Sequence, residues 1–160
     1  MIKDKIKSLN CLIKIVLNLK QKNKKIVFTN GCFDLLHYGH VDYLEQAKKN
    51  GDILLVGLNS DLSVTKIKGS GRPINNQDAR AYLVAALQSV DYVVIFNAST
   101  PLDIIMKLEP DVLVKGADWK AEEIVGSDYV KACGGRVAQI DFVKGYSTTN
   151  LVKKIVKKNS

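Results

Sequence analysis

The stretch from Thr29 to His40 reads TNGCFDLLHYGH and is the most informative part of this chain. It follows the apolar run Ile26–Phe28, which predicts a buried strand, and it precedes Val41–Lys49, which has helical periodicity. A glycine-bearing turn between a strand and a helix start presents free backbone N–H groups at the positive end of the helix dipole. The stretch therefore predicts a phosphate-binding turn.

The only two histidines of the chain, His37 and His40, lie in this turn. Two imidazoles at this spacing can donate hydrogen bonds to one phosphate, whose oxygens gain charge while the α-phosphorus is attacked. Gly31 and Gly39 let the backbone approach a ligand closely. Paired histidines also bind metals, but no third His, Cys or acid lies at ligand spacing. The turn therefore predicts phosphate-transfer chemistry on a nucleotide.

Two other side chains of the turn have open or minor roles. Asp34 can orient a histidine, meet a magnesium ion through water or cap the turn, and the sequence does not separate these roles. Cys32 is disfavoured as a nucleophile, because direct phosphoryl transfer needs no thiol.

Strand-like and helix-like runs alternate along the rest of the chain, which predicts parallel β-α-β units in a sheet covered on both faces. The expected strands are Lys25–Thr29, Ile53–Leu58, Tyr92–Phe96, Val112–Val114 and Arg136–Ile140. The expected helices are Lys3–Lys20, Val41–Lys49, Asn76–Leu87, Pro101–Lys107, Ser127–Ala132 and Thr148–Lys157. Such sheets bind ligands beyond the carboxyl ends of their strands, where the histidine turn begins.

A length of 160 residues favours one domain, with an N-terminal amphipathic helix in residues 1–22 and a catalytic core in residues 24–157. The apolar stripe of that helix is expected to comprise Ile2, Ile6, Leu9, Ile13, Val16 and Leu17. No apolar run approaches the roughly 20 residues of a membrane span, and the N-terminal stretch does not read as a signal peptide. We expect no membrane association.

The formal charge of +8 is concentrated at the two ends of the chain. Residues 1–25 carry +7 and residues 151–160 carry +4, so the middle of the chain carries −3. Solvated lysine faces explain this better than a nucleic-acid surface does, since no aromatic-rich basic motif is present. The three cysteines, an odd number at irregular spacing, fit free thiols in a reducing cytoplasm.

Three further motifs are candidates for the site. Residues 66–76 read KIKGSGRPINN and predict a mobile loop whose cations, Lys68 and Arg72, close over a triphosphate, with Lys66 as a competitor for that role. Residues 145–149 read GYSTT, and their hydroxyls predict a helix cap, a second phosphate contact or both. Residues 114–119 read VKGADW and supply a glycine, an acid and an aromatic ring for a pocket.

These motifs resemble the nucleotidyltransferase superfamily with the H-x-G-H signature, here residues 37–40. The resemblance is closest to the adenylyltransferase domain of bacterial ADP-heptose synthase. The blocks that carry it, in order, are TNGCFDLLHYGH, VGLNSD, KGSGRPIN, the stretch from DAR to LQSVDYVV, TPLDII, PDVLVKGADW and GYSTTNLVKKI. The resemblance covers residues 24–157 and implies a Rossmann-like α/β fold of the nucleotidyltransferase type.

The resemblance implies transfer of AMP from ATP to D-glycero-β-D-manno-heptose 1-phosphate, giving ADP-heptose and pyrophosphate for lipopolysaccharide core or surface glycan synthesis. Magnesium would bridge phosphates and have no direct protein ligand. The implied catalytic residues are His37, His40 and Lys68. The implied nucleotide or phosphate contacts are Thr29, Asn30, Gly31, Phe33, Asp34, Gly39, Arg72, Arg80, Lys115, Gly116, Asp118, Ser147, Thr148 and Thr149. Asn59 and Asp61 are expected on the substrate side, with Asp118 also matching an acid near that side.

The chain differs from the proteins it resembles at two positions and in lacking a fused kinase domain. Phe142 stands where cytidylyltransferases carry an arginine before the STT block, which leaves Lys144 as a substitute cation. Ala117 replaces a glycine or acid, with unknown effect. The sugar kinase often fused to this domain is missing, so a separate kinase and phosphatase are expected, and a homo-oligomer, such as a dimer, is expected too.

Two alternative functions remain open at the level of sequence. The first is a nucleotidyltransferase for another small phosphate, either glycerol 3-phosphate with CTP or FMN with ATP. The second is a non-catalytic nucleotide-binding module that regulates a partner. A class I aminoacyl-tRNA synthetase is disfavoured, because 160 residues leave no anticodon-binding domain and no KMSKS-like block is present.

Overall fold

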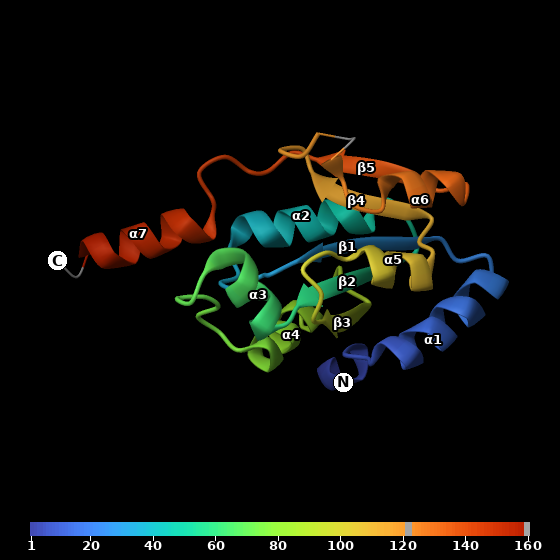
Figure 1. Cartoon of the computed structure of the whole chain (residues 1–160), viewed down its shortest axis with the longest axis horizontal. Helices are drawn as coiled ribbons and strands as arrows, with labels where there is room; N and C mark the ends of the chain where they lie inside the picture. The colour runs from blue at the N-terminus through green and yellow to red at the C-terminus, as the bar shows by residue number, and fades with distance from the viewer. Residues whose placement is uncertain (121–122, 159–160) are drawn as a thin grey trace.

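The computed structural model describes residues 1–120 and 123–158 (Figure 1). It contains one five-stranded sheet in the order β3-β2-β1-β4-β5, and every pairing is parallel. The strands are β1 (Ile26–Gly31), β2 (Ile53–Asn59), β3 (Tyr92–Phe96), β4 (Val112–Gly116) and β5 (Arg136–Ile140). The helices are η1 (Ile2–Lys5), α1 (Leu9–Gln21), α2 (Tyr38–Lys48), α3 (Asp61–Lys68), α4 (Gln77–Ala85), α5 (Leu102–Leu108), α6 (Ser127–Ala132) and α7 (Thr148–Lys158).

Two hydrophobic clusters sandwich the sheet. On one face, side chains of α2 and α4 pack on alternate strand residues such as Val27 and Val56. On the other face, α1, α5 and α6 pack on the intervening residues, including Phe28 and Leu55. A strand buried on both faces reads as a continuous apolar run, which is why these segments are recognisable in the sequence. The expected α/β sheet with helices on both faces is confirmed.

The strand order reverses between β1 and β4. From β1 the chain proceeds outward through β2 and β3, then returns to the other side of β1 to form β4 and β5. A doubly wound sheet binds its ligands beyond the carboxyl ends of the strands at this reversal. The histidine turn follows β1 and therefore lies at that point.

The single N-terminal helix expected over residues 3–20 is wrong. A short 3-10 turn, η1, ends before Ile6, which forms a parallel bridge with Val93 at the edge of β3, and the Lys7 amide donates to the Val93 carbonyl at 2.9 Å. The α-helix starts afresh after Ser8, whose hydroxyl accepts from the Cys11 amide. The N-terminal segment thus covers the exposed edge of the sheet, which protects an edge strand from pairing with other chains.

The expected stripe is confirmed at Leu9, Ile13 and Val16, which pack on the core, but it omitted Leu12 and wrongly included Leu17. Leu12 and Val16 are the buried residues of this helix, whereas Leu17 is 58% exposed. Restarting the helix at Leu9 changes which side chains share the inner face. The stripe that included Leu17 assumed one continuous helix from the N-terminus.

Helix α3 was not expected from the sequence. Ser60 caps it, accepting from the Ser63 amide at 3.2 Å, and it ends at Gly69, where φ is 96°. The serine followed by Asp61 in the first turn is a helix-start signal that the periodicity obscured. The loop expected over residues 66–76 therefore begins only after Lys68.

Helix α7 projects from one end of the molecule beyond α2, away from the sheet (Figure 1). The Ser147 hydroxyl accepts from the Asn150 amide at 3.1 Å, which confirms the expected helix cap. Of its described residues, none is buried. Within residues 1–120 and 123–158, no helix combines the length and apolar character needed to cross a membrane.

Candidate active site

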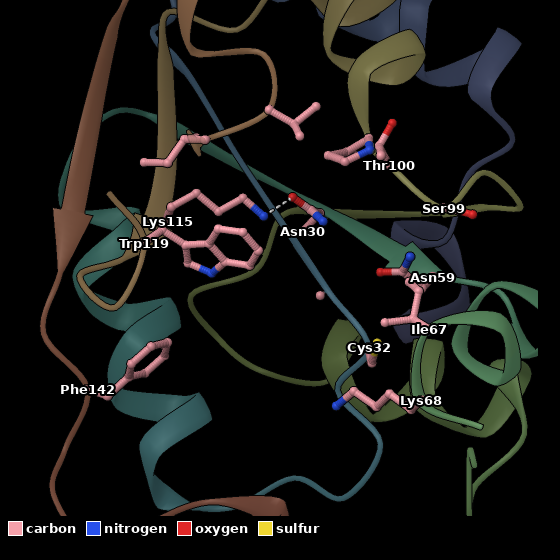
Figure 2. Close-up of a pocket in the computed structure, with 14 residues that line it drawn as sticks. Asn30, Cys32, Asn59, Ile67, Lys68, Ser99, Thr100, Lys115, Trp119 and Phe142 are labelled. Atoms are coloured by element: carbon pink, nitrogen blue, oxygen red, sulfur yellow. Dashed lines mark hydrogen bonds between the residues drawn. The ribbon is translucent and has the colours of Figure 1, made fainter. Parts of the chain in front are cut away.

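A cavity of about 460 Å³, here called the main cavity, opens at the carboxyl ends of β1, β2 and β4 (Figure 2). Its size lies in the range of small-molecule sites. It is lined by Asn30, Gly31, Cys32, Asn59, Ile67, Lys68, Ser99, Thr100, Pro101, Lys115, Trp119, Ile124, Val125 and Phe142. Five of the residues expected in the site, Asn30, Gly31, Asn59, Lys68 and Lys115, meet here although they come from four separate segments.

A smaller cavity of about 160 Å³, here called the histidine cavity, adjoins the main one and shares seven of its lining residues. His40 and Phe33 line it together with Lys68 from the end of α3 and Lys115 from β4. An imidazole and two ammonium groups thus face one small polar space. This arrangement is suited to an anion the size of a phosphate.

The two imidazoles stack on each other. Their ring centroids are 3.8 Å apart with an interplanar angle of 19°, and the Phe33 ring meets His40 edge-on at 5.2 Å. The Nδ1 atoms of His37 and His40 are buried and have no hydrogen-bond partner among the described residues. Buried polar atoms normally find partners, so these imidazoles have hydrogen-bonding capacity that the described residues leave unused.

Burial controls the protonation of the pair. Burial lowers the pKa of His40 to about 4, assisted by the charges of His37 and Lys68 and opposed by a backbone hydrogen bond to Leu35. Burial also lowers the pKa of His37. Both imidazoles are therefore neutral near pH 7, and an incoming phosphate would favour their protonated forms.

His37 and Gly39 position the start of α2. His37 is the N-cap residue of this helix, and its carbonyl accepts from the amides of His40 and Val41. A Cβ added to Gly39 would lie 3.2 Å from the His37 ring and 3.3 Å from the Tyr146 Cβ. The glycine therefore makes room for the His37 ring and for the segment that precedes α7.

Lys115 lies inside the cleft, where its ammonium group donates to the Asn30 side-chain oxygen at 2.5 Å, with the Trp119 indole beside it (Figure 2). Burial lowers the pKa of Lys115 to about 8, opposed chiefly by the charge of Asp118. A buried ammonium group is costly unless a charge compensates it. An anionic ligand in the histidine cavity would provide that compensation.

A third cavity of about 260 Å³, here called the C-terminal cavity, lies on the other side of the histidine pair. It is lined by Leu36, His37, Tyr38, Gly145, Tyr146, Ser147, Asn150, Leu151 and Lys154. Ser147 lines this cavity together with His37, whereas Thr148 and Thr149 lie in the first turn of α7 and are not among the lining residues. The substitute cation Lys144 does not line the cavity either, whereas Lys154 does.

Several expected ligand contacts are engaged inside the protein instead. The Thr29 hydroxyl is fully buried and shares a hydrogen bond of 2.8 Å with Tyr43. The guanidinium of Arg80 is fully buried; it donates to the carbonyls of Cys32, Asn59 and Asn75 and to the Asp61 carboxylate. Arg80 therefore ties the ends of β1 and β2 to the following loop, and in this conformation neither it nor Thr29 touches a cavity.

Arg72 is directed at Asp34. Its Nη1 lies 2.9 Å from the carboxylate. Arg72, which the sequence predicted to close over a triphosphate, is thus paired with Asp34 and lines none of the three cavities. Asp34 is 2% exposed and lines none of the three cavities. Asp118 is exposed and lies near Gly116 beside the histidine cavity, without lining it.

The structure adds Ser99, Thr100 and Phe142 to the site residues expected from the sequence. Ser99 and Thr100 follow β3, and the rule that parallel strands end at one edge could have identified them. Phe142 follows β5 and covers Gly116, where an added Cβ would lie 2.2 Å from the ring. Trp119, the aromatic ring that residues 114–119 were expected to supply, lines both the main and histidine cavities. Two exposed aromatic rings at the mouth of a cleft suit a nucleobase or sugar face.

The described residues contain no group of three or more His, Cys, Asp or Glu side chains that could hold a metal ion. The thiol of Cys32 is held protonated, because burial raises its pKa despite the charges of Lys68 and Arg80.

Comparison with known proteins agrees with this geometry. A family model described as cytidylyltransferase-like matches residues 28–154, which include both histidines and the start of α7. The chain belongs to the cytidylyltransferase-like family. The likeness extends to the structural level: the crystal structure of the lipopolysaccharide core biosynthesis protein from Thermoplasma volcanium GSS1 is similar with a TM-score of 0.62 at 29% identity, covering 78% of this chain and 99% of that one.

Curated relatives are more similar in sequence. The "Bifunctional protein HldE" of Campylobacter concisus is 58% identical over 152 residues, and that of Geobacter metallireducens is 54% identical over 153 residues. These matches cover 94% and 96% of this cytidylyltransferase-like chain, respectively. The chain spans only 31% of the length of either protein, so it corresponds to one part of a larger relative.

Proposed function

We propose that this protein is an adenylyltransferase that transfers AMP from ATP to D-glycero-β-D-manno-heptose 1-phosphate, releasing pyrophosphate. The observation that carries the proposal is the stacked pair of His37 and His40 with unpartnered Nδ1 atoms. One imidazole lines the histidine cavity and the other lines the C-terminal cavity. A triphosphate crossing the pair would place its α-phosphate in the first space and its outer phosphates in the second.

In this arrangement the sugar phosphate attacks the α-phosphorus in line, the new P–O bond forms, and the bond to the pyrophosphate oxygen breaks. The imidazoles donate hydrogen bonds to the oxygens that gain charge, and the ammonium groups of Lys68 and Lys115 add electrostatic stabilisation. No covalent enzyme intermediate is needed. Most of the rate enhancement comes from holding the two substrates in line.

Magnesium with ATP would neutralise phosphate charge, and the residues present fit a metal held mainly by the substrate. The main cavity, with hydroxyl and amide groups at Ser99, Thr100 and Asn59, would take the sugar phosphate. Support for a heptose substrate comes from the sequence blocks shared with ADP-heptose synthases and from the structural relative named for lipopolysaccharide core biosynthesis. We further propose a cytoplasmic location, a homo-oligomer such as a dimer, and a separate kinase and phosphatase in the same pathway.

Pyrophosphate release with a panel of phosphates and nucleoside triphosphates tests the proposal. We expect turnover with ATP and heptose 1-phosphate, and little with CTP and glycerol 3-phosphate or with ATP and FMN. The reverse preference would show that the acceptor is another small phosphate and not heptose 1-phosphate. ATP binding with no turnover on any acceptor would indicate a regulatory module.

The variant His40→Ala tests the role of His40 in catalysis. Loss of one transition-state donor is expected to lower turnover by about 10²–10³-fold with the fold intact. A near-normal rate would remove His40 from the mechanism, even if the wild-type protein makes ADP-heptose. Circular dichroism of the variant checks that the fold is retained.

A further inference from the structure

Asp34 lies in the turn between β1 and α2, three residues before His37, and it is fastened to the loop between α3 and α4. Its carboxylate accepts from the Arg72 guanidinium at 2.9 Å, the Ile74 amide at 2.8 Å and the Asn75 amide at 3.0 Å. Its backbone carbonyl accepts from the Asn75 side chain at 3.0 Å. Four hydrogen bonds thus join Asp34 to three residues of the loop, Arg72, Ile74 and Asn75.

The carboxylate is held as an anion although it is 2% exposed. Burial by itself would raise the pKa of Asp34, but the hydrogen bonds from Asn75, Arg72 and Ile74 outweigh burial and lower it. Both carboxylate oxygens are used by these donors. A metal or phosphate contact would have to compete with bonds that are already formed, and the described residues offer no cluster of acids around Asp34 for a metal.

Arg80 reinforces the same connection. Its Nε donates to the Asn75 carbonyl at 3.0 Å, and its Nη1 donates to the Cys32 carbonyl at 2.6 Å, two residues before Asp34. Asn75 is therefore bound to the histidine turn from both sides. In contrast, a Cβ added at Gly69 or Gly71 would meet nothing within 4 Å among the described residues, so the loop tip is not packed.

We propose that Asp34 is a positioning residue that fastens the histidine turn to residues 72–75 and thereby sets the orientation of His37 and His40, without touching nucleotide or metal. The inference rests on the proposed function for its kinetic consequences only. We call these bonds the Asp34 tether. The tether also holds Arg72 behind the site, so that Lys68 and Lys115 supply the cationic charge in the histidine cavity.

The kinetic test compares Asp34→Ala, Asp34→Asn, Arg72→Gln and the double variant Asp34→Ala/Arg72→Gln. Misplacing catalytic groups by about 1 Å costs about 10²-fold, so we expect a fall of that size in kcat for Asp34→Ala. Asp34→Asn keeps an acceptor for the loop amides and should retain more activity. The double variant should be no slower than Asp34→Ala, because both changes break the same connection.

The magnesium dependence separates the tether from direct ligand contacts. The tether predicts that the magnesium concentration for half-maximal rate is the same in wild type and Asp34→Asn. A rise of about tenfold in that concentration, or rate losses that add in the double variant, would overturn the proposal. Asp103→Asn is the matched control, since it removes an exposed carboxylate paired with Lys107 on α5 and should leave kcat unchanged.

Hydrogen exchange tests the tether without any substrate. In Asp34→Ala the amides of Ile74 and Asn75 lose their acceptor, and we expect exchange in residues 72–76 to accelerate by about tenfold or more while β1 and β2 stay protected. Unchanged exchange in that segment would refute the tether. If Asp34→Ala does not fold, exchange is compared between wild type and Arg72→Gln, which removes one of the bonds to the Asp34 carboxylate and leaves the two amide donors. The tether then predicts a smaller acceleration confined to residues 72–76, and no acceleration would refute it. Faster exchange in a protein that does not act on heptose 1-phosphate would uphold the tether and reject the proposed function.

Discussion

The protonation state of the stacked histidines links the site to the stability of the fold. Packing two imidazoles at 3.8 Å under partial burial disfavours their charged forms, which lowers the pKa of His40 to about 4. The unfolded chain binds this proton near its ordinary pKa of 6.5, whereas the folded chain does not until about pH 4. Acid therefore favours the unfolded state in that interval.

We predict that the free energy of unfolding decreases as pH falls from 7 to 5, and that His40→Gln decreases less over the same range. Urea unfolding at the two pH values measures both quantities. The depressed pKa of Asp34 does not contribute in this interval, because its stabilising effect is lost only below its ordinary value of 3.8. Identical pH dependence in wild type and His40→Gln would show that His40 is not held neutral.

At the scale of single residues, the sequence identified polar groups near the site but not what they contact. Arg80 and Asp34 were expected to bind the ligand, but both form hydrogen bonds inside the protein. Arg80 donates to the Cys32 carbonyl, and Asp34 accepts from the Asn75 amide. A buried charge needs partners, and those partners lie 41 and 48 positions away in the chain. No local pattern could reveal them.

Among the elements, α1 shows how a cap changes a hydrophobic stripe. Because Ser8 restarts the helix, Leu12 faces the core between β1 and α5, while Leu17 faces solvent. Leu12 is fully buried and Leu17 is 58% exposed, so the two leucines form a matched pair.

We predict that Leu12→Ala lowers the free energy of unfolding by about 2–5 kcal/mol, as expected when a buried leucine leaves a cavity. Leu17→Ala should change it by less than about 0.5 kcal/mol. Chemical denaturation followed by circular dichroism gives both values. Equal losses would mean that Leu17 also packs on the sheet, as the expected stripe had implied.

Helix α7 offers a second matched pair on adjacent positions. Both lysines are exposed, but Lys154 lines the C-terminal cavity with His37 and Ser147 and Lys153 does not. In the proposed mechanism, the cation near the outer phosphates would thus be Lys154, in the second turn of α7. It would take the place of the arginine that cytidylyltransferases carry at the position of Phe142.

We predict that Lys154→Gln raises the KM for ATP, and for pyrophosphate in the reverse reaction, by about tenfold or more, the effect of losing one hydrogen bond to a charged group. Lys153→Gln should leave both constants near wild type. A loss of the same size in both variants would indicate a general charge effect of this basic helix, and no loss in either would remove Lys154 from the site.

For the whole molecule, the site joins parts of the chain that are remote in sequence. The cavities collect residues from Asn30 near the start of the domain to Lys154 in the last helix. A ligand that binds this assembled site and not the unfolded chain stabilises the entire fold through mass action.

We predict that ATP raises the thermal midpoint in proportion to the logarithm of its concentration, equivalent to about 2.7 kcal/mol at 100 times its Kd. Adenosine, which lacks phosphates for the histidine and C-terminal cavities, should give a much smaller shift. Differential scanning calorimetry makes the comparison. Equal shifts from adenosine and ATP would contradict a phosphate-centred site.

The sequence alone determined the α/β sheet, all five strands within a few residues, and the histidine turn after β1. These features follow from local causes: continuous apolar runs mark strands buried on both faces, and a glycine-bearing strand-to-helix turn exposes N–H groups. Only the tertiary structure decided that Ile6 leaves the first helix to pair with β3, that Arg72 turns to Asp34, and that Lys154 reaches the cavity beside His37. Each of these depends on a partner distant in the chain, because hydrogen bonds and buried charges are satisfied by whatever the fold brings within reach.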